Sequence, residues 1–209
     1  MRLIEDLKWR YAVKKFDASK KVEEEKVQEI LKAGNLTASS FGMQAFRFVL
    51  VRDKTILTKL SEYSWGEQLK GASHMILLTA KTKVDSDFIK NYVNYTAKIR
   101  NTEQEKLELF EKVVSGHLKT LEEENRKDEW AARQTYIVLG TLLAACANAR
   151  VDSCPMEGIE KAMFDEILDL PSKNLTTISA LPIGYRAEDD KYQHLPKVRR
   201  PLEDMVIEY

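Results

Sequence analysis

The amino-acid sequence predicts an α+β or mixed α/β domain in which helices flank a central sheet. Two observations predict the sheet. Segment 46–53 is rich in β-branched and aromatic residues, and 74–81 is a nearly continuous apolar run, typical of a strand buried on both faces. A third observation concerns 129–150, a helical segment that is apolar around most of its circumference and must be covered on all sides. The length of 209 residues suits one well-cored domain, expected to span 1–209.

Helical and strand patterns follow one another along the chain. Leu3, Ile4 and Leu7 recur at helical spacing, and 23–31 opens with three glutamates and is closed by Gly34-Asn35. The later elements are expected as a strand at 46–53, a helix at 54–63, a strand at 74–81, helical structure at 86–126, a helix at 129–150, a short strand at 151–154, a helix at 160–169 and a last core strand at 176–186.

Three of these segments bear on assembly and on the site. Segment 86–126 is polar and charged with one apolar stripe, and its length fits two helices, or one long one, on the outside of the fold. The long helix 129–150 requires a central core position or a subunit interface, and we favour both at once. From Ala187 onward the chain contains Pro196 and Pro201 and no core pattern, so we expect an extended tail of the kind that often wraps a neighbouring chain.

Composition excludes several classes of protein. There are 33 basic and 33 acidic side chains, and zero net charge argues against nucleic acid or an anionic membrane as the main partner. The chain has no 18-residue apolar run, and its start is not a signal peptide, so we expect a cytoplasmic protein. Cys146 and Cys154 stand in apolar contexts and are expected to be buried thiols.

Common catalytic motifs are missing. No GxGxxG follows any strand, and no GxxxxGK[ST] phosphate loop or GxSxG turn occurs. The three histidines, His74, His117 and His194, have no close Cys or Asp neighbours in a ligand pattern, so we expect no metal site. His74, at the start of an apolar run, is expected to be a structural, hydrogen-bonded histidine.

Four stretches carry candidate binding residues. Arg10 and Lys14 near the start, with Lys197, Arg199 and Arg200 near the end, form two basic clusters that either hold a phosphate together or are ordinary solvated charges. Segment 36–46 is either a ligand-binding loop or a plain helix-to-strand turn. On its own, Trp65 favours a core position, and Glu157-Gly158 favours a simple turn.

Taken together and in order, these stretches resemble the FMN-dependent nitroreductase family, in particular the oxygen-insensitive NAD(P)H nitroreductases and related flavin reductases. The resemblance covers nearly the whole chain. The matching stretches are RYAVKKFDASKKV, ASSFGMQAFRFVLV, WGEQLKGASHMILL, EWAARQTYIVLG, PMEG, ALPIGYR and LPKVRR. It implies a nitroreductase-like α+β fold with a mixed, mainly antiparallel sheet, a long central helix, and an extended C-terminal tail at a dimer interface. It also implies a homodimer with two FMN sites, each built from both chains.

The resemblance assigns roles residue by residue. Arg10, Lys197 and Arg199 would grip the FMN phosphate, while Lys14 would reach the pyrimidine edge of the flavin. The remaining cofactor contacts implied are Tyr11 and Ala12, the loop Ser39, Ser40, Gly42 and Gln44 from the partner subunit, the pair Trp65 and Gln68, the turn Pro155, Met156, Glu157 and Gly158 near flavin N5, and, more weakly, Gln134. Segment 86–126 would cap the active site.

The activity implied is the NAD(P)H-dependent reduction of nitroaromatics, quinones or dihydropteridines by ping-pong hydride transfer through the flavin. No side-chain acid or base is required, because the cofactor carries the chemistry. Two alternatives stay open: a specialised flavoenzyme, such as a dihydropteridine reductase, a reductive dehalogenase or a flavin-supplying reductase, and a flavin-binding dimer of the same fold without turnover.

Four positions depart from the family pattern. Ala12 stands where many relatives have Ser, Gly42 and Ala45 replace a frequent Asn and Pro, and Gln68 replaces a Lys. With one cation fewer near the pyrimidine edge, we expect a slightly lower flavin potential than in Lys-bearing members. Redox titration of the protein beside a Gln68→Lys variant tests this expectation, and an unchanged midpoint potential would contradict it.

Overall fold

Four antiparallel strands form the sheet, in the order β1–β2–β4–β3. The computed structural model describes residues 1–209. The strands are β1 (Phe46–Val51), β2 (His74–Lys81), β3 (Asp152–Ser153) and β4 (Leu175–Gly184). The expected mixed, mainly antiparallel sheet is therefore present, and its one parallel pairing is the isolated bridge between Ala12 and Ser153 beside β3.

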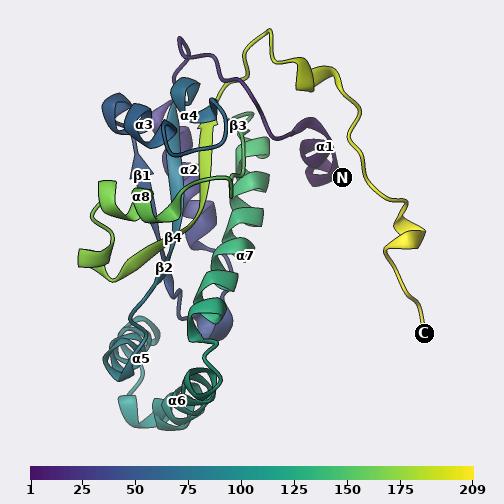
Figure 1. The fold of residues 1–209 in the computed structure, drawn as a ribbon. Coiled ribbons are helices and arrows are strands. Elements are labelled where there is room, and N and C mark those ends of the chain that lie inside the picture. Colours follow the sequence, from purple (N-terminus) through teal and green to yellow (C-terminus); the bar gives the residue numbers. More distant parts are fainter.

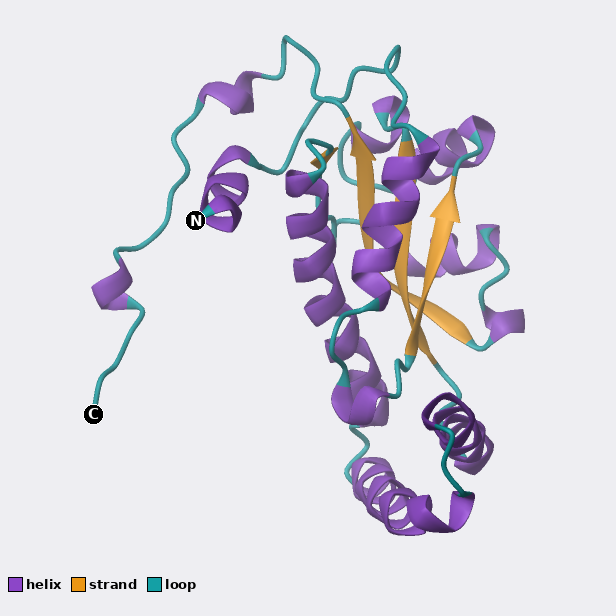
Figure 2. Ribbon diagram, turned by 180° about the vertical axis from the view of Figure 1, so that it is seen from behind, coloured by secondary structure: helices purple, strands orange, loops and turns teal.

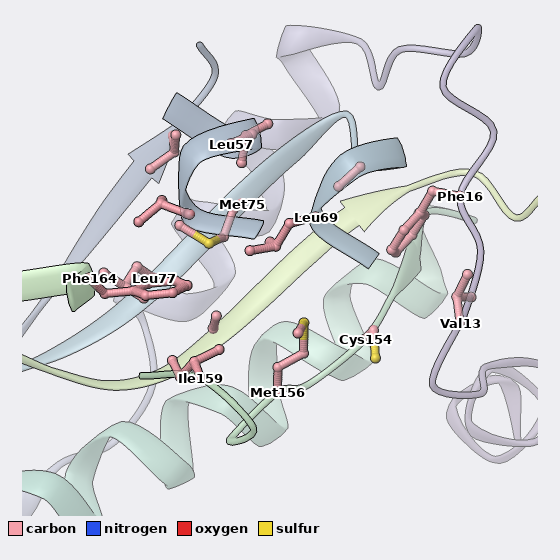
Figure 3. Close-up of a cluster of buried hydrophobic side chains, with 14 of the residues drawn as sticks. Val13, Phe16, Leu57, Leu69, Met75, Leu77, Cys154, Met156, Ile159 and Phe164 are labelled. Carbon is pink, nitrogen blue, oxygen red and sulfur yellow. The ribbon is translucent and has the colours of Figure 1, made fainter. Parts of the chain in front are cut away.

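Strand β2 lies at the centre of the core, and its alternating side chains supply both faces of the sheet. Met75 and Leu77 point into one apolar cluster, which Figure 3 shows together with Leu57, Phe164 and Met156. Ile76 and Leu78 point into a second cluster on the opposite face. All but the last residue of β2 is buried, which explains the continuous apolar run at 74–81.

Helices cover both faces of this sheet (Figures 1 and 2). On one face lie α2 (Glu24–Asn35) and the long α7 (Lys127–Asn148); on the other lie α3 (Lys54–Ser61), α4 (Gln68–Gly71) and α8 (Lys161–Ile167). Helix α1 (Arg2–Trp9) packs near the end of α7, while α5 (Ser86–Arg100) and α6 (Glu108–Glu123) extend beyond the end of the sheet. None of the helices combines the length and the apolar character needed to cross a membrane.

The structure decides between the two readings of 86–126. Two helices form, because Asn101 adopts the left-handed conformation (φ 47°) and ends α5. Their shared apolar stripe packs into a third cluster with Trp130 and Val84, so this segment has a core of its own.

Helix α2 ends at Asn35, so Gly34-Asn35 closes it as expected, although the helical pattern was recognised only as far as residue 31. Gly34 also allows α7 to approach, because a Cβ there would lie 2.7 Å from the Leu142 side chain. The short helix α4 was not expected within 64–74, since a four-residue helix has too little periodicity to stand out.

Helix α7 is covered on one side only within this chain. Its inner face buries Trp130, Val138 and Leu142, whereas Tyr136 and Ile137 are 42% and 50% exposed. The tail after Ala187 is extended as expected, apart from two short 3₁₀ turns, and Figure 1 shows it leading away from the body of the protein.

Both thiols are buried and free, as expected. Burial raises the pKa of Cys146 to about 12, so this thiol remains protonated at neutral pH.

His74 is fully buried at the start of β2, and its Nδ1 lies 2.9 Å from the Ser73 hydroxyl. Burial lowers the pKa of His74; the Glu24 carboxylate, 4.0 Å from Nε2, opposes this shift, and Lys21, Arg52 and Lys54 add to it. The imidazole of His74 therefore binds a proton more readily in the unfolded chain than in the folded chain.

We expect the free energy of unfolding to fall as the pH drops below the unfolded histidine value of about 6.5, by at most about 1.4 kcal/mol per pH unit. Urea unfolding at pH 7.5 and 5.5 measures this loss. His74→Gln should reduce the loss and the exposed control His194→Gln should keep it, so equal losses in both variants would contradict the assignment.

Candidate functional site

Basic residues from the two ends of the chain meet beside α1. The ammonium group of Lys197 donates hydrogen bonds to the carbonyl oxygens of Leu7 and Arg10. Arg10, Lys14, Lys197 and Arg199 line one cavity of about 420 Å³. The structure thus brings the two basic clusters together; Arg200 does not line the cavity.

This cavity holds positive charge without a compensating carboxylate. Burial, followed by the charge of Arg199, lowers the pKa of Arg10, and burial with the charges of Arg10 and Arg199 lowers the pKa of Lys197. The Nε of Arg10 is buried without a hydrogen-bond partner, and no acidic side chain lines the cavity. Three repelling cations and a free N–H donor are the features that a phosphate group would satisfy.

Asp190 fixes the segment that carries Arg10 and Lys14. Its carboxylate is buried and accepts hydrogen bonds from the Tyr11 hydroxyl at 3.0 Å, from the Lys14 N–H at 2.8 Å and from the Tyr192 N–H at 3.0 Å. Burial raises the pKa of Asp190, but the N–H groups of Lys14 and Tyr192 and the Tyr11 hydroxyl lower it by more, so this carboxylate is charged at neutral pH. Tyr11 is therefore oriented by Asp190.

The largely buried ion pair between Arg186 and Asp152 also supports the segment around Arg10. Arg186 donates to Asp152 from its backbone N–H at 2.8 Å and from Nε at 2.9 Å. The Arg186 guanidinium also stacks at 4.5 Å from the ring centre of Trp9 and 4.6 Å from that of Tyr11. The residues on either side of Arg10 are thereby packed against the strand that leads to Pro155.

The turn 155–158 offers two unused backbone donors. Met156 exchanges hydrogen bonds with Ala180 of β4 at 2.8 and 3.0 Å, and the Gly158 carbonyl accepts from the Trp65 N–H at 2.7 Å. Between these anchors, the N–H groups of Glu157 and Gly158 donate no hydrogen bond. Adjacent free N–H groups in a fixed turn suit a ligand acceptor such as a ring nitrogen.

Trp65 and Gln68 lie at opposite extremes of exposure. Trp65 is 81% exposed, so the core position favoured by its sequence context was wrong; it covers Gly158, where an added Cβ would lie 2.9 Å from its ring. Gln68 is buried, and its Oε1 has no hydrogen-bond partner. That acceptor is available to a ligand N–H group.

The loop from Ser39 to Gln44 lies apart from the cavity at Arg10. The Ser40 N–H donates to Oε1 of Gln134 at 2.7 Å, and the Gln44 N–H donates to the Ser39 hydroxyl at 3.1 Å. Gly42 has φ 72°, and a Cβ there would meet the Tyr92 hydroxyl at 2.6 Å. This group includes Gln134 and touches α5, and none of its members lines the cavity at Arg10.

The length of α7 separates the Ser39 loop from the cavity at Arg10. Gln134 lies in the first half of this helix, whereas Asn148 at its end donates to Asp6 of α1 at 3.1 Å. From Gln134 to Asn148 the helix rises roughly 21 Å, at about 1.5 Å per residue. Within one chain, the residues assigned to the cofactor therefore form two groups at different levels of α7.

A cavity of about 550 Å³ adjoins the second group. Met43, Gln44, Arg47, Lys81 and Tyr92 contribute to its walls. It contains none of the residues at the chain ends, and no group of three or more His, Cys, Asp or Glu side chains could hold a metal ion anywhere in the chain.

Comparison with known proteins places these features in a family. The model of the nitroreductase family matches residues 7–185. The chain belongs to the nitroreductase family. A Bacillus subtilis protein with the provisional name NAD(P)H nitroreductase YfkO is 34% identical over 216 residues, which cover 98% of this chain and 96% of the relative.

Solved structures of nitroreductase-like proteins share the fold. A provisionally assigned nitroreductase of Bacillus subtilis, YdfN, superposes with a TM-score of 0.87 at 16% identity, covering 100% of this chain and 99% of the other. A provisionally assigned nitroreductase of Exiguobacterium sibiricum, crystallised with FMN, has a TM-score of 0.83 at 20% identity, covering 99% and 97%. The predicted nitroreductase-like fold is thus confirmed.

Reasoning from the sequence missed two supports of the candidate site. Asp190 and the pair Asp152–Arg186 join segments far apart in the chain, and neither has a local pattern. The only signal was compositional: Asp152 is a charged residue directly beside an apolar strand, and such residues are rarely buried without a partner.

Proposed function

We propose that this nitroreductase family member is an FMN-dependent NAD(P)H oxidoreductase that reduces nitroaromatics, quinones or related small acceptors. The observation that carries the proposal is the cavity at Arg10, where three cations gather without an acid and Arg10 Nε has no partner. The FMN bound by the Exiguobacterium protein and the NAD(P)H in the names of curated relatives support the same chemistry.

The residues present fit FMN both at its phosphate and at its flavin ring. Arg10, Lys197 and Arg199 would bind the phosphate, which lowers their mutual repulsion. The free N–H groups of Glu157 and Gly158 would donate to the ring, and the buried Oε1 of Gln68 would accept from it. When bound, FMN would supply the hydride chemistry between NAD(P)H and the acceptor.

The protein's own side chains would bind and shield rather than transfer protons. Lys14 is exposed, lies 6.0 Å from the Tyr192 ring centre and has no ion-pair partner, so its charge is available to the pyrimidine edge. The exposed Trp65 would cover one side of the site next to Gly158. Donor and acceptor would bind in turn on the remaining open face, which is a ping-pong scheme.

A homodimer completes this proposal. The apolar residues Tyr136 and Ile137 on α7 are exposed, and so are Met205, Ile207 and Tyr209 in the tail. A second copy could cover both surfaces and bring its Ser39–Gln44 loop, with α5 and α6 as a cap, to the cofactor. Light scattering coupled to gel filtration tests this, and a monomer with bound FMN would contradict it.

A colour test examines the activity. The purified protein should be yellow, lose its colour anaerobically with NADH or NADPH, and regain it on addition of nitrofurazone or menadione. Yellow protein that neither nicotinamide bleaches would show a binding protein without turnover, and colourless protein that rejects added FMN would overturn the proposal.

A further inference from the structure

The side chain of Glu157 is held by a tyrosine from α7. The Tyr136 hydroxyl donates a hydrogen bond of 2.5 Å to Oε1 of Glu157, from the exposed face of α7 to the turn 155–158. This is the only hydrogen bond of the Glu157 carboxylate, which also has no ion-pair partner. The hydrogen bond to Glu157, with burial, raises the pKa of Tyr136 to about 12, so the phenol remains protonated and continues to donate.

Glu157 brings a negative charge to the turn 155–158. Its backbone N–H and that of Gly158 are the two free donors of the proposed site, and its carboxylate is a strong hydrogen-bond acceptor. A carboxylate without a partner competes for unpaired donors nearby, and local bonds between side chain and backbone are common in turns. A negative charge also disfavours the addition of electrons to a cofactor beside it.

We propose that Tyr136 is a positioning residue that fastens the Glu157 carboxylate to α7, so that the two N–H donors stay open to the flavin and the negative charge stays away from it. The inference rests on the proposed function, because it assigns the turn 155–158 to the flavin ring. A phenol suits this role, since it binds the carboxylate by a donor that brings no charge of its own into the site.

The rest of the turn does not depend on this bond. Met156 is paired with Ala180 on one side, and the Gly158 carbonyl is paired with Trp65 on the other. Removal of the phenolic oxygen should therefore release the carboxylate while the backbone of the turn stays in place. The two effects can be separated by combining the variant with one that has no charge at position 157.

The experiment is a double-mutant cycle of Tyr136→Phe and Glu157→Gln in the FMN-loaded protein. In Tyr136→Phe we expect the affinity for reduced relative to oxidised FMN to fall about tenfold, which corresponds to about 30 mV in the two-electron midpoint potential. In the Glu157→Gln background, the same Tyr136→Phe change should leave the midpoint potential unchanged, because no charge remains to be released. Tyr63→Phe, a half-buried tyrosine whose hydroxyl has no hydrogen bond and which lines neither cavity, is the matched control.

Two results would overturn the inference: an unchanged potential in Tyr136→Phe, or an equal shift with and without the charge at position 157. A spectrophotometric pH titration of the protein without added FMN separates this failure from failure of the proposed function; subtracting the titration of the matching Tyr136→Phe variant isolates Tyr136 from the other tyrosines. Glu157→Gln should move the ionisation of Tyr136 down from about 12 towards its ordinary value, whether or not FMN binds. If that shift occurs and FMN does not bind, the proposed function fails and the hydrogen bond stands; if the shift is absent, the hydrogen bond itself is refuted.

Discussion

Replacement of Arg10 by glutamine is expected to weaken FMN binding by about ten- to a hundredfold, because one charge-assisted hydrogen bond contributes about 1.5–3 kcal/mol. The free energy of unfolding of the protein without FMN should stay the same or rise. In that state Arg10 is repelled by Arg199 and Lys197 and has no acidic partner, so its removal relieves repulsion. Lys197 keeps its bond to the carbonyl of residue 10 in the variant, because that oxygen belongs to the backbone.

Isothermal titration with FMN and urea unfolding without FMN measure the two effects. Arg100→Gln is the matched control, since this exposed arginine at the end of α5 makes no ion pair or side-chain hydrogen bond. It should change neither quantity. An Arg10→Gln variant that binds FMN as tightly as the unchanged protein would remove the phosphate site from this cavity.

Replacement of Asp152 by alanine should destabilise the fold by about 3–5 kcal/mol, the usual cost of leaving one member of a buried ion pair without its partner. Asp152 is 4% exposed and accepts three separate donors of Arg186, whose guanidinium is enclosed by Trp9 and Tyr11. Its loss leaves the Arg186 charge partly buried and unpaired.

Denaturation by guanidinium chloride gives the size of the effect from the shift in midpoint at constant slope. Glu123→Ala, which breaks the exposed pair Lys119–Glu123 at 3.8 Å, should change stability by less than about 1 kcal/mol. If the two variants lost similar stability, the pair Asp152–Arg186 would have to be regarded as a surface interaction.

The elements with strong patterns could be predicted from the sequence, and those that depend on long-range contacts could not. The run at 74–81 identified β2 correctly, because a strand buried on both faces needs apolar residues at every position. The end of α2 at Gly34-Asn35 was also recognisable from a local signal, whereas the close contact of Gly34 with Leu142 was not. That contact depends on another helix far along the chain.

Some residues of the candidate site could likewise be recognised from the sequence, and others could not. The cations at the two ends of the chain were recognisable from residue type and from family resemblance, and the structure brings them to one cavity. Asp190, which orients Tyr11 and Lys14, and Tyr136, which holds Glu157, were not recognised. Their roles depend on geometry between distant segments, and a single aspartate or tyrosine carries no local sign of it.

The contacts of Asp190, Lys197 and Arg199 with the first α-helix and the residues after it have a consequence for biosynthesis. Asp190 is translated 176 residues after Lys14, and Lys197 and Arg199 follow it. The cavity at Arg10 therefore cannot close until these residues have left the ribosome. Insertion of the cofactor should follow that point, and a nascent chain arrested before Asp190 should not retain flavin.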